Sequence, residues 1–174
     1  MTNSDAIERH IISVLVDNEP GVLARVIGLF SGRGYNIESL TVAEVDRQKH
    51  LSRISIATTG TLMVIEQIKS QLARLVPIHS VCDLTQIGAS IERELALVKI
   101  INSGDDRIEA LRIADTFRAR TLDSTLESFV FEITGTSSKV AAFIDLMQSL
   151  GEVEISRTGV SAISRGNRID LSAK

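Results

Sequence analysis

The sequence predicts an α+β protein made of two ferredoxin-like βαββαβ modules in tandem. Its apolar residues switch repeatedly between the period of a strand and the period of a helix. The same order of elements then recurs in the second half of the 174 residues. Two modules of roughly 80 residues can each bury a modest core. We therefore place the modules at residues 8–86 and 91–166, followed by a polar tail at 167–174.

The first module starts with a strand that leads into a helix. Its predicted strands cover residues 10–17, 36–45, 51–59 and 78–84. The first helix covers 22–30, where apolar residues form one stripe, and it ends at Gly32-Arg33-Gly34 because glycine tolerates a left-handed C-cap. Thr61 caps the second helix and Pro77 stops it. The polar residues 46–49 join the two middle strands as a hairpin.

The second module repeats this order after residues 86–90. A nearly continuous apolar strand at 94–101 indicates that both of its faces are covered. One helix is predicted at 105–117 and another after the cap at 135–138, with a strand pair across 121–133 between them. Residues 153–163 then close the module as a single strand.

Composition excludes several classes of protein. Apolar residues make up 44%, and no apolar run approaches the roughly 18 residues needed to cross a bilayer. The first five residues lack the basic-then-apolar pattern of a signal peptide, so we expect a cytoplasmic protein. The 19 basic against 22 acidic residues, with only 3% aromatic residues, argue against a nucleic-acid partner.

No set of residues for catalysis or metal binding is apparent in the sequence. Cys82 is the single cysteine, so it cannot form a disulfide within the chain, and it shows no metal-ligand spacing with His10, His50 or His79. A partly buried strand histidine is the usual explanation for His79, because an activated nucleophile needs a positioned base and usually a third group. The glycines of 28–34 lie late in a helix, so they do not form a dinucleotide-binding turn.

The turn at 17–21 is the most informative part of the chain. A strand runs into Asn18-Glu19-Pro20-Gly21, and a helix follows at once. Pro20 suits the first helical position, and Gly21 removes the side chain that would keep a ligand from free backbone N–H groups. Because a helix N-terminus is partially positive, the turn is suited to a carboxylate or a phosphate. The alternative is an ordinary capped loop in which Asn18 only caps the helix.

Two stretches of the chain resemble known families. The pattern Asp17-x-x-Pro20-Gly21-Val22-Leu23 after a strand is similar to the opening of ACT domains, the βαββαβ modules that bind amino acids. The longer string RVIGLFSGRGYNIESLTV, at 25–42, resembles the regulatory (small) subunit of acetohydroxyacid synthase, also called acetolactate synthase. Further similar residues lie at 92–100, 135–139, 157–160 and 164–166, so the resemblance covers about residues 8–166.

This resemblance implies a non-catalytic regulatory subunit whose first module is an ACT domain. Such a subunit activates the catalytic large subunit and confers feedback inhibition by valine, or another branched-chain amino acid, in valine, leucine and isoleucine biosynthesis. Thiamine diphosphate, magnesium and FAD would then belong to the large subunit rather than to this chain. A freestanding ACT-type amino-acid sensor that acts on another enzyme or regulator is the alternative.

The resemblance also implies a homodimer through ACT domains, with the effector between the two copies. The effector-binding residues would be Asn18, Pro20, Gly21, Val22 and Leu23 of one protomer and Asn36 and Ile37 of the other. Backbone N–H groups suit the carboxylate of a free amino acid, and amide oxygens suit its ammonium group. Asn36 has an alternative explanation as a turn residue after Gly34-Tyr35. The second module has Asp105 and Asp106 in place of the Pro-Gly turn, so we expect no equivalent site there.

Overall fold

The chain folds into two βαββαβ modules, as the sequence predicts. The structure is a computed structural model that describes residues 6–167 and 169. Contacts divide these residues into two compact units. One unit contains the described residues up to Ile91 together with those from Val160 onward, and the other is Glu92–Gly159. The predicted absence of a signal peptide at residues 1–5 and most of the predicted tail at 167–174 lie outside the described residues.

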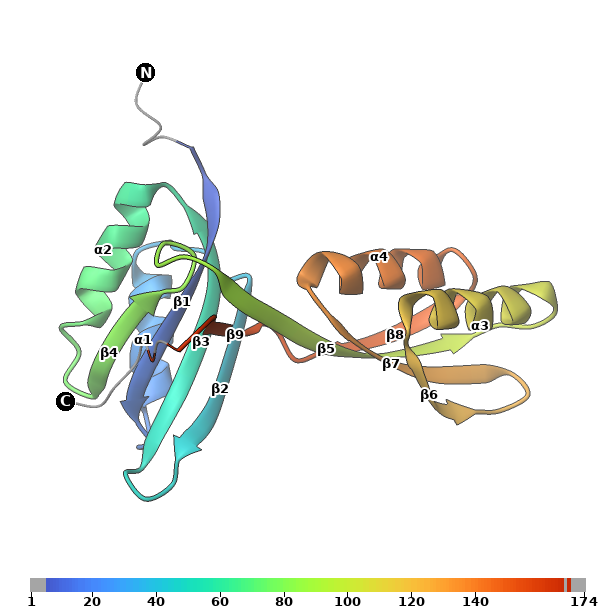
Figure 1. Cartoon of the computed structure of the whole chain (residues 1–174), viewed down its shortest axis with the longest axis horizontal. Helices are drawn as coiled ribbons and strands as arrows, with labels where there is room; N and C mark the ends of the chain where they lie inside the picture. Colours follow the sequence, from blue (N-terminus) through green and yellow to red (C-terminus); the bar gives the residue numbers. More distant parts are fainter. Residues whose placement is uncertain (1–5, 168, 170–174) are drawn as a thin grey trace. The chain divides into compact units, whose positions relative to one another are not determined.

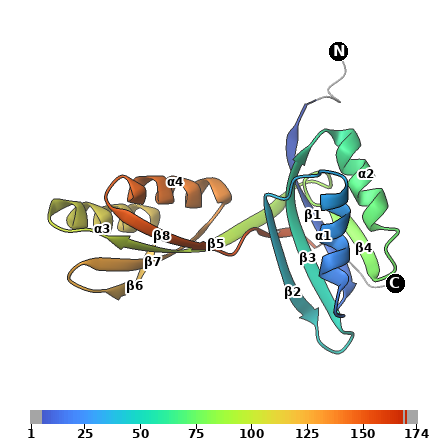
Figure 2. The same cartoon turned by 180° about the vertical axis from the view of Figure 1, so that it is seen from behind.

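The first unit is an antiparallel sheet covered on one face by two helices (Figures 1 and 2). Its strands are β1 (Glu8–Asp17), β2 (Ser39–Asp46), β3 (Leu51–Gly60) and β4 (Ile78–Asp83), in the order β2-β3-β1-β4. Its helices are α1 (Val22–Gly32) and α2 (Leu62–Leu72). The predicted cap of α2 is present, since the Thr61 hydroxyl accepts a hydrogen bond from the Val64 N–H.

The core of the first unit follows from the alternation of side chains along β1 and β3. Ile12, Val14 and Val16 point to the helix face, where they pack with Ile54 and Ile56. The helices close this core with the stripes that the sequence predicts. Their buried side chains are Val22, Val26 and Phe30 of α1 and Ile65, Ile68 and Leu72 of α2.

The second unit repeats the same topology. Its elements are β5 (Ser90–Ile101), α3 (Asp105–Phe117), β6 (Arg120–Ser124), β7 (Ser128–Gly135), α4 (Ser137–Gln148) and β8 (Glu152–Arg157). The strand order is β6-β7-β5-β8, which matches the order of the first sheet. Three phenylalanines fill the centre of its core, because Phe131 packs edge-on against Phe143 and in a tilted arrangement against Phe129.

The prediction of one strand over 153–163 is wrong. The chain leaves β8 after Arg157, turns at Gly159 with φ 82°, and forms the separate strand β9 (Ser161–Ser164). Val160 and Ala162 then pack against Ile11 and Leu84 of the first unit. The predicted second module at 91–166 therefore differs from the compact unit, which ends at Gly159.

Hydrogen bonds explain why the segment after Gly159 belongs to the first unit. The Thr41 hydroxyl donates to the Val160 carbonyl at 2.9 Å, and the Val160 N–H donates to the Ser39 hydroxyl at 3.2 Å. Further along, the Arg165 N–H donates to the Ala89 carbonyl at 3.0 Å. These contacts cover the sheet face opposite the helices, which a lone ACT-like module would leave open. Apolar residues alternate both before and after Gly159, so the sequence pattern does not indicate that the strand is interrupted there.

Two ion pairs between β5 and β8 allow a direct comparison of buried and exposed charge. Glu94 is buried, with 2% of its side chain exposed, and it pairs with Arg157. Lys99 and Glu154 form a 2.6 Å pair whose side chains are 47% and 76% exposed, and the hydrogen bond from Lys99 lowers the pKa of Glu154. The two pairs join the same strands but differ in burial.

We expect Arg157→Ala to lower the free energy of unfolding by about 3–5 kcal/mol, because it leaves the Glu94 carboxylate buried without its counter-charge. Lys99→Ala is the matched control, and its effect should be close to the error of the measurement. Urea unfolding of both variants checks this prediction. Equal losses for the two variants would contradict it.

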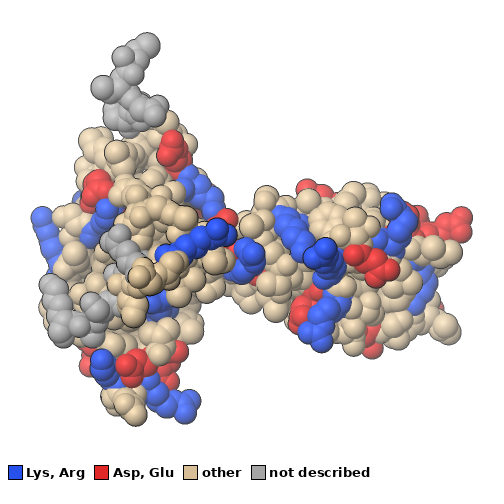
Figure 3. All heavy atoms as spheres, viewed as in Figure 1, with Lys and Arg blue, Asp and Glu red and all other residues tan. Residues whose placement is uncertain are grey.

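Charge is mixed on one face of the molecule. On the face drawn in Figure 3, basic and acidic side chains are interspersed over both units rather than gathered into one basic stripe. Among the described helices, none is long and apolar enough to cross a membrane.

Candidate functional site

The predicted ligand-binding turn is a tight reverse turn between β1 and α1. The Val22 N–H donates to the Glu19 carbonyl at 3.4 Å, and Gly21 has φ 84° and ψ −8°. This conformation at the third residue, with proline at the second, is that of a type II turn. Pro20 therefore lies before the helix, and its predicted place at the first helical position is wrong. The turn requires proline and glycine for their backbone preferences, and α1 begins only at Val22.

The start of α1 has unused backbone donors. Gly21 is its N-cap, and no side chain forms a cap hydrogen bond. The first helical hydrogen bond runs from the Arg25 N–H to the Gly21 carbonyl at 3.1 Å, so the Leu23 and Ala24 N–H groups have no acceptor within the helix. Gly21 is exposed, and a Cβ built on it would meet no atom within 4 Å. The donors therefore face open space at the positive end of the helix.

Asn18 does not cap the helix, which removes the alternative explanation for that residue. Its side-chain NH₂ donates to Glu44 Oε1 of β2 at 3.2 Å, while its backbone N–H donates to the His50 carbonyl at 2.7 Å. The amide oxygen of Asn18 remains available as an acceptor next to the Glu44 carboxylate. Glu44 was missed in the sequence, because its place beside Asn18 depends on the register of β2 against β3.

A second contact fixes the base of the turn. His79 lies on β4, as predicted, and its Nε2 is 2.6 Å from Asp17 Oδ1, with both side chains partly exposed. The Asp17 N–H also donates to the Pro77 carbonyl at 2.9 Å. The residue immediately before Asn18 is therefore tied to β4 by its side chain and to Pro77, just before β4, by its backbone. The sequence offered no signal for this pair, which joins residues 62 positions apart.

Asn36 and Ile37 lie in the loop after α1. The explanation of Asn36 as a turn residue requires a positive φ at that position. In this loop the positive φ, 70°, is at Gly34 and not at Asn36, so that explanation is wrong. The Asn36 carbonyl accepts a 2.5 Å hydrogen bond from the Thr58 hydroxyl of β3. Its side chain is exposed, while Ile37 is half-buried against the core. The backbone is held, and the polar side chain of Asn36 is free to meet a ligand.

Within one chain, the two groups of predicted residues lie at opposite ends of the sheet. The turn at Asn18 is bonded to His50 and the loop at Asn36 to Thr58, and these contacts are eight residues apart along the chain that forms β3. At a strand rise of about 3.3 Å per residue, that separation is roughly 26 Å. One residue of fully extended chain spans only about 3.5 Å, so a free amino acid is far too short to touch both groups in one protomer.

The side chains of the first group differ in what they can offer. Asn18, Pro20 and Gly21 are exposed, and Leu23 is half-buried. Val22 is 5% exposed and packs in the core, so its side chain does not face a ligand. The group thus provides backbone donors, one amide and a partly apolar edge. That combination suits a small molecule with a carboxylate, an ammonium group and an apolar side chain.

The second unit lacks this arrangement. Its first helix has Gly104 as N-cap, and Asp105 and Asp106 occupy the first turn. Carboxylates there oppose an anionic ligand. In the part of the chain that the structure describes, no three His, Cys, Asp or Glu side chains come together as a metal site.

Two family models match successive parts of the chain. Residues 12–80 match the family model of the AHAS small subunit-like ACT domain, and residues 93–166 match the model of the small subunit of acetolactate synthase. The acetolactate synthase isozyme 3 small subunit of Escherichia coli is 48% identical over 162 residues, which cover 92% of this chain and 98% of that protein. The chain belongs to the acetolactate synthase small subunit family.

Other relatives extend the comparison. The acetolactate synthase small subunit of Haemophilus influenzae is 44% identical over 161 residues, covering 92% of this chain and 98% of that protein. The crystal structure of the small subunit from Thermotoga maritima has a TM-score of 0.83 and 40% identity, covering 92% of this chain and 99% of that chain. As a regulatory small subunit, this protein works with a large catalytic subunit that uses thiamine diphosphate.

Proposed function

We propose that this small subunit binds a branched-chain amino acid, with valine as the expected effector, between two copies of its first unit. The bound effector then causes feedback inhibition of the catalytic subunit that this chain activates. The observation that supports this proposal is the roughly 26 Å between the two groups of site residues in one chain, estimated from the strand rise. A second copy supplies the missing group if its Asn36 end lies against the Gly21 end of the first.

The exposed side of α1 provides a surface for that second copy. Ala24, Gly28 and Gly32 recur every four residues and are exposed, so they share one side of the helix. A Cβ built on Gly28 or Gly32 would meet no atom within 4 Å. Without side chains in the way, a second α1 can approach closely. Two copies related by a two-fold axis through Gly28 run antiparallel, which places the Gly21 end of each helix beside the Asn36 end of the other.

The exposed edge of the sheet supports the same two-fold arrangement of two copies. β2 is an edge strand, and its backbone can pair with a second β2. Val42 pairs with Ile54, which pairs with Val14, so it lies on the core side of the sheet. It is nevertheless 46% exposed. A second copy beside β2 would cover this apolar side chain.

The chemistry of an amino acid matches the two ends that this packing joins. The carboxylate accepts from the N–H groups of the first turn of α1, at the positive end of that helix. The ammonium group donates to the Asn18 amide oxygen and is attracted by Glu44, and Asn36 of the second copy offers another amide oxygen. Leu23 and Ile37 line the apolar part. Valine has one methylene fewer than leucine or isoleucine, a difference worth about 1–3 kcal/mol in such a slot.

Catalysis stays with the partner. Thiamine diphosphate, magnesium and FAD are expected on the catalytic subunit, and this chain contributes activation and the response to the effector. For the effector to act at a distance, it must bind more tightly to the inhibited state of the complex than to the active state.

Reconstitution with the cognate catalytic subunit tests the proposal. Adding this chain should raise acetolactate synthase activity, and valine should then inhibit the complex but not the catalytic subunit alone. Calorimetry with valine, leucine and isoleucine ranks the effectors. If the chain binds valine but neither activates the catalytic subunit nor makes it sensitive to valine, it is a freestanding sensor and the proposal fails.

A further inference from the structure

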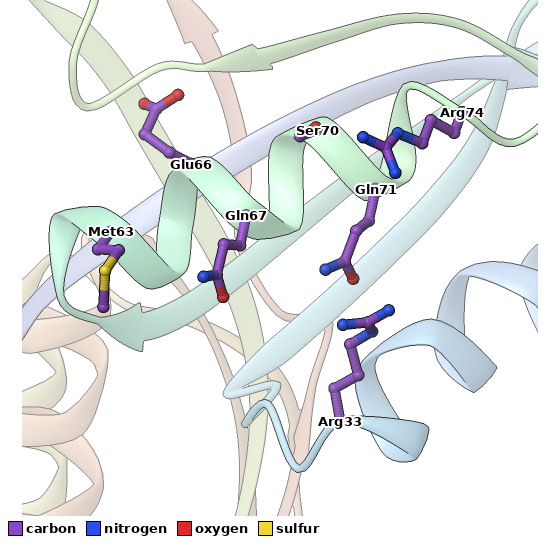
Figure 4. A pocket seen from close by; sticks show the side chains of 7 residues that line it. All are labelled: Arg33, Met63, Glu66, Gln67, Ser70, Gln71 and Arg74. Carbon is purple, nitrogen blue, oxygen red and sulfur yellow. The ribbon is translucent and has the colours of Figure 1, made fainter.

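The helices of the first unit form a groove that the effector proposal does not use. The groove lies between the end of α1 and the length of α2, and its volume is about 480 Å³. Figure 4 shows Arg33, at the end of α1, pointing toward Gln71 of α2. Gln67 lies beside Gln71 on α2, and Arg74 lies just beyond the end of that helix. Met63 lines its other end.

The groove carries positive charge without a counter-charge. Within the residues that the structure describes, neither Arg33 nor Arg74 pairs with a carboxylate. Glu66 is the one carboxylate in the lining, and it is occupied by Lys69, whose Nζ is 2.7 Å from Glu66 Oε1. The hydrogen bond from Lys69 lowers the pKa of Glu66, which keeps that pair ionised and neutral as a whole. The two guanidinium groups are therefore left to bind an anion from outside, in the bidentate manner that suits a carboxylate.

The groove also contains an acceptor without a donor. Gln71 Oε1 is buried and has no hydrogen-bond partner. A buried acceptor left unpaired costs free energy, so an occupant is favoured if it brings an N–H group to which the Gln71 amide oxygen can turn. Met63, which is 67% exposed, adds apolar surface to the lining.

We infer that this groove binds an acidic segment of the catalytic subunit. Such a segment supplies all three requirements at once: carboxylates for Arg33 and Arg74, backbone N–H groups for Gln71, and apolar side chains for Met63. A free phosphate supplies acceptors for the arginines but neither of the other two. As a small subunit, the chain needs a contact surface for its catalytic partner, and a groove along about three turns of α2 has the extent for a short peptide segment.

The position of the groove also connects it to the effector site. Arg33 lies three residues before Asn36, and the Tyr35 hydroxyl between them donates to Gln67 Oε1 at 3.4 Å. The Tyr35 ring packs edge-on against Phe30 of α1. An effector held at Asn36 thus acts on the same loop that presents Arg33 to the catalytic subunit. This connection rests on the proposed effector site, whereas the docking of the acidic segment does not.

Charge reversal in the full chain tests the inference. Activity of the catalytic subunit is measured against the concentration of Arg33→Glu, Arg74→Glu and the double variant. Each single variant should raise the half-activating concentration about ten-fold and the double variant about 100-fold. Lys49→Glu is the matched control, because Lys49 is an exposed cation of the β2–β3 hairpin outside the groove, and it should activate like the wild type. Added salt should weaken activation by the wild type but not by the double variant.

Two further measurements separate the possible outcomes. Thermal unfolding and valine calorimetry of the double variant should match the wild type, so that a loss of activation reflects docking rather than folding or the effector site. Unchanged half-activating concentrations in both arginine variants would overturn the inference. Calorimetric binding of inorganic phosphate that is lost in Arg74→Glu, while activation is retained, would also overturn it and assign the groove to a free anion.

Discussion

Gly21→Asp is expected to lower the affinity for the branched-chain effector by at least about 100-fold, because two carboxylates would meet at the start of α1. Gly21 is exposed, and its Cβ would meet no atom within 4 Å, so the substitution does not disturb packing in the protomer. Its φ of 84° costs some stability in any other residue, but aspartate and asparagine tolerate this region better than most. The carboxylate would also occupy the N–H groups that the effector needs.

Gly21→Asn is the matched control for that experiment. Asparagine has the size of aspartate and accepts the same backbone conformation, but it has no charge. Valine calorimetry on the two variants separates electrostatic repulsion from steric and backbone effects. Asn18→Ala should weaken binding by a smaller factor, because it removes one amide oxygen. Equal affinities of Gly21→Asp and Gly21→Asn would show that the helix N-terminus does not hold the carboxylate.

Gly28→Leu is expected to separate the dimer and, with it, to abolish effector binding. The leucine side chain would stand on the stripe of Ala24, Gly28 and Gly32, where the proposed second α1 approaches. A clash at the centre of an interface typically costs 2 kcal/mol or more, so the dimer dissociation constant should rise at least about 30-fold. Leucine favours a helix over glycine by roughly 0.8 kcal/mol, so the isolated protomer should not be destabilised.

Analytical ultracentrifugation and calorimetry on the same samples check this prediction. Ala142→Leu is the control, because Ala142 is an exposed small residue on α4 of the second unit. It should leave both the dimer and valine binding unchanged. A Gly28→Leu protein that remains dimeric and binds valine normally would show that α1 does not form the interface.

The sequence predicted the order of elements well, because the period of the apolar residues and the flanking turn residues agreed. The helix at 105–117 is confirmed from end to end, since Gly104 precedes it and its apolar stripe stops at Phe117. The single strand over 153–163 failed because apolar alternation continues past Gly159. What breaks the strand is packing of Val160 against residues near the start of the chain, and local period carries no information about that contact.

The candidate site was predictable only in part, because some of its contacts also depend on residues far apart in the sequence. Asn18, Gly21 and Asn36 stood out by residue type and by family resemblance, and their effector-binding role remains a prediction. Glu44 and His79 did not stand out, because they reach the turn only through strand register and a contact 62 residues away. Two alternative explanations could be tested only with the structure. That Asn18 caps the helix depends on a hydrogen bond of its side chain, and that Asn36 is a turn residue depends on its φ value.

The central claim is that each effector site is shared between two copies of the chain. Mixing Gly21→Asp with Asn36→Leu, under conditions that allow subunit exchange, tests it most directly by valine calorimetry. Each variant alone should bind no valine, because both of its sites are damaged. In a mixed dimer one site combines the intact Gly21 of one copy with the intact Asn36 of the other, so the mixture should recover about a quarter of the wild-type sites. No recovery, with exchange confirmed, would contradict the shared site.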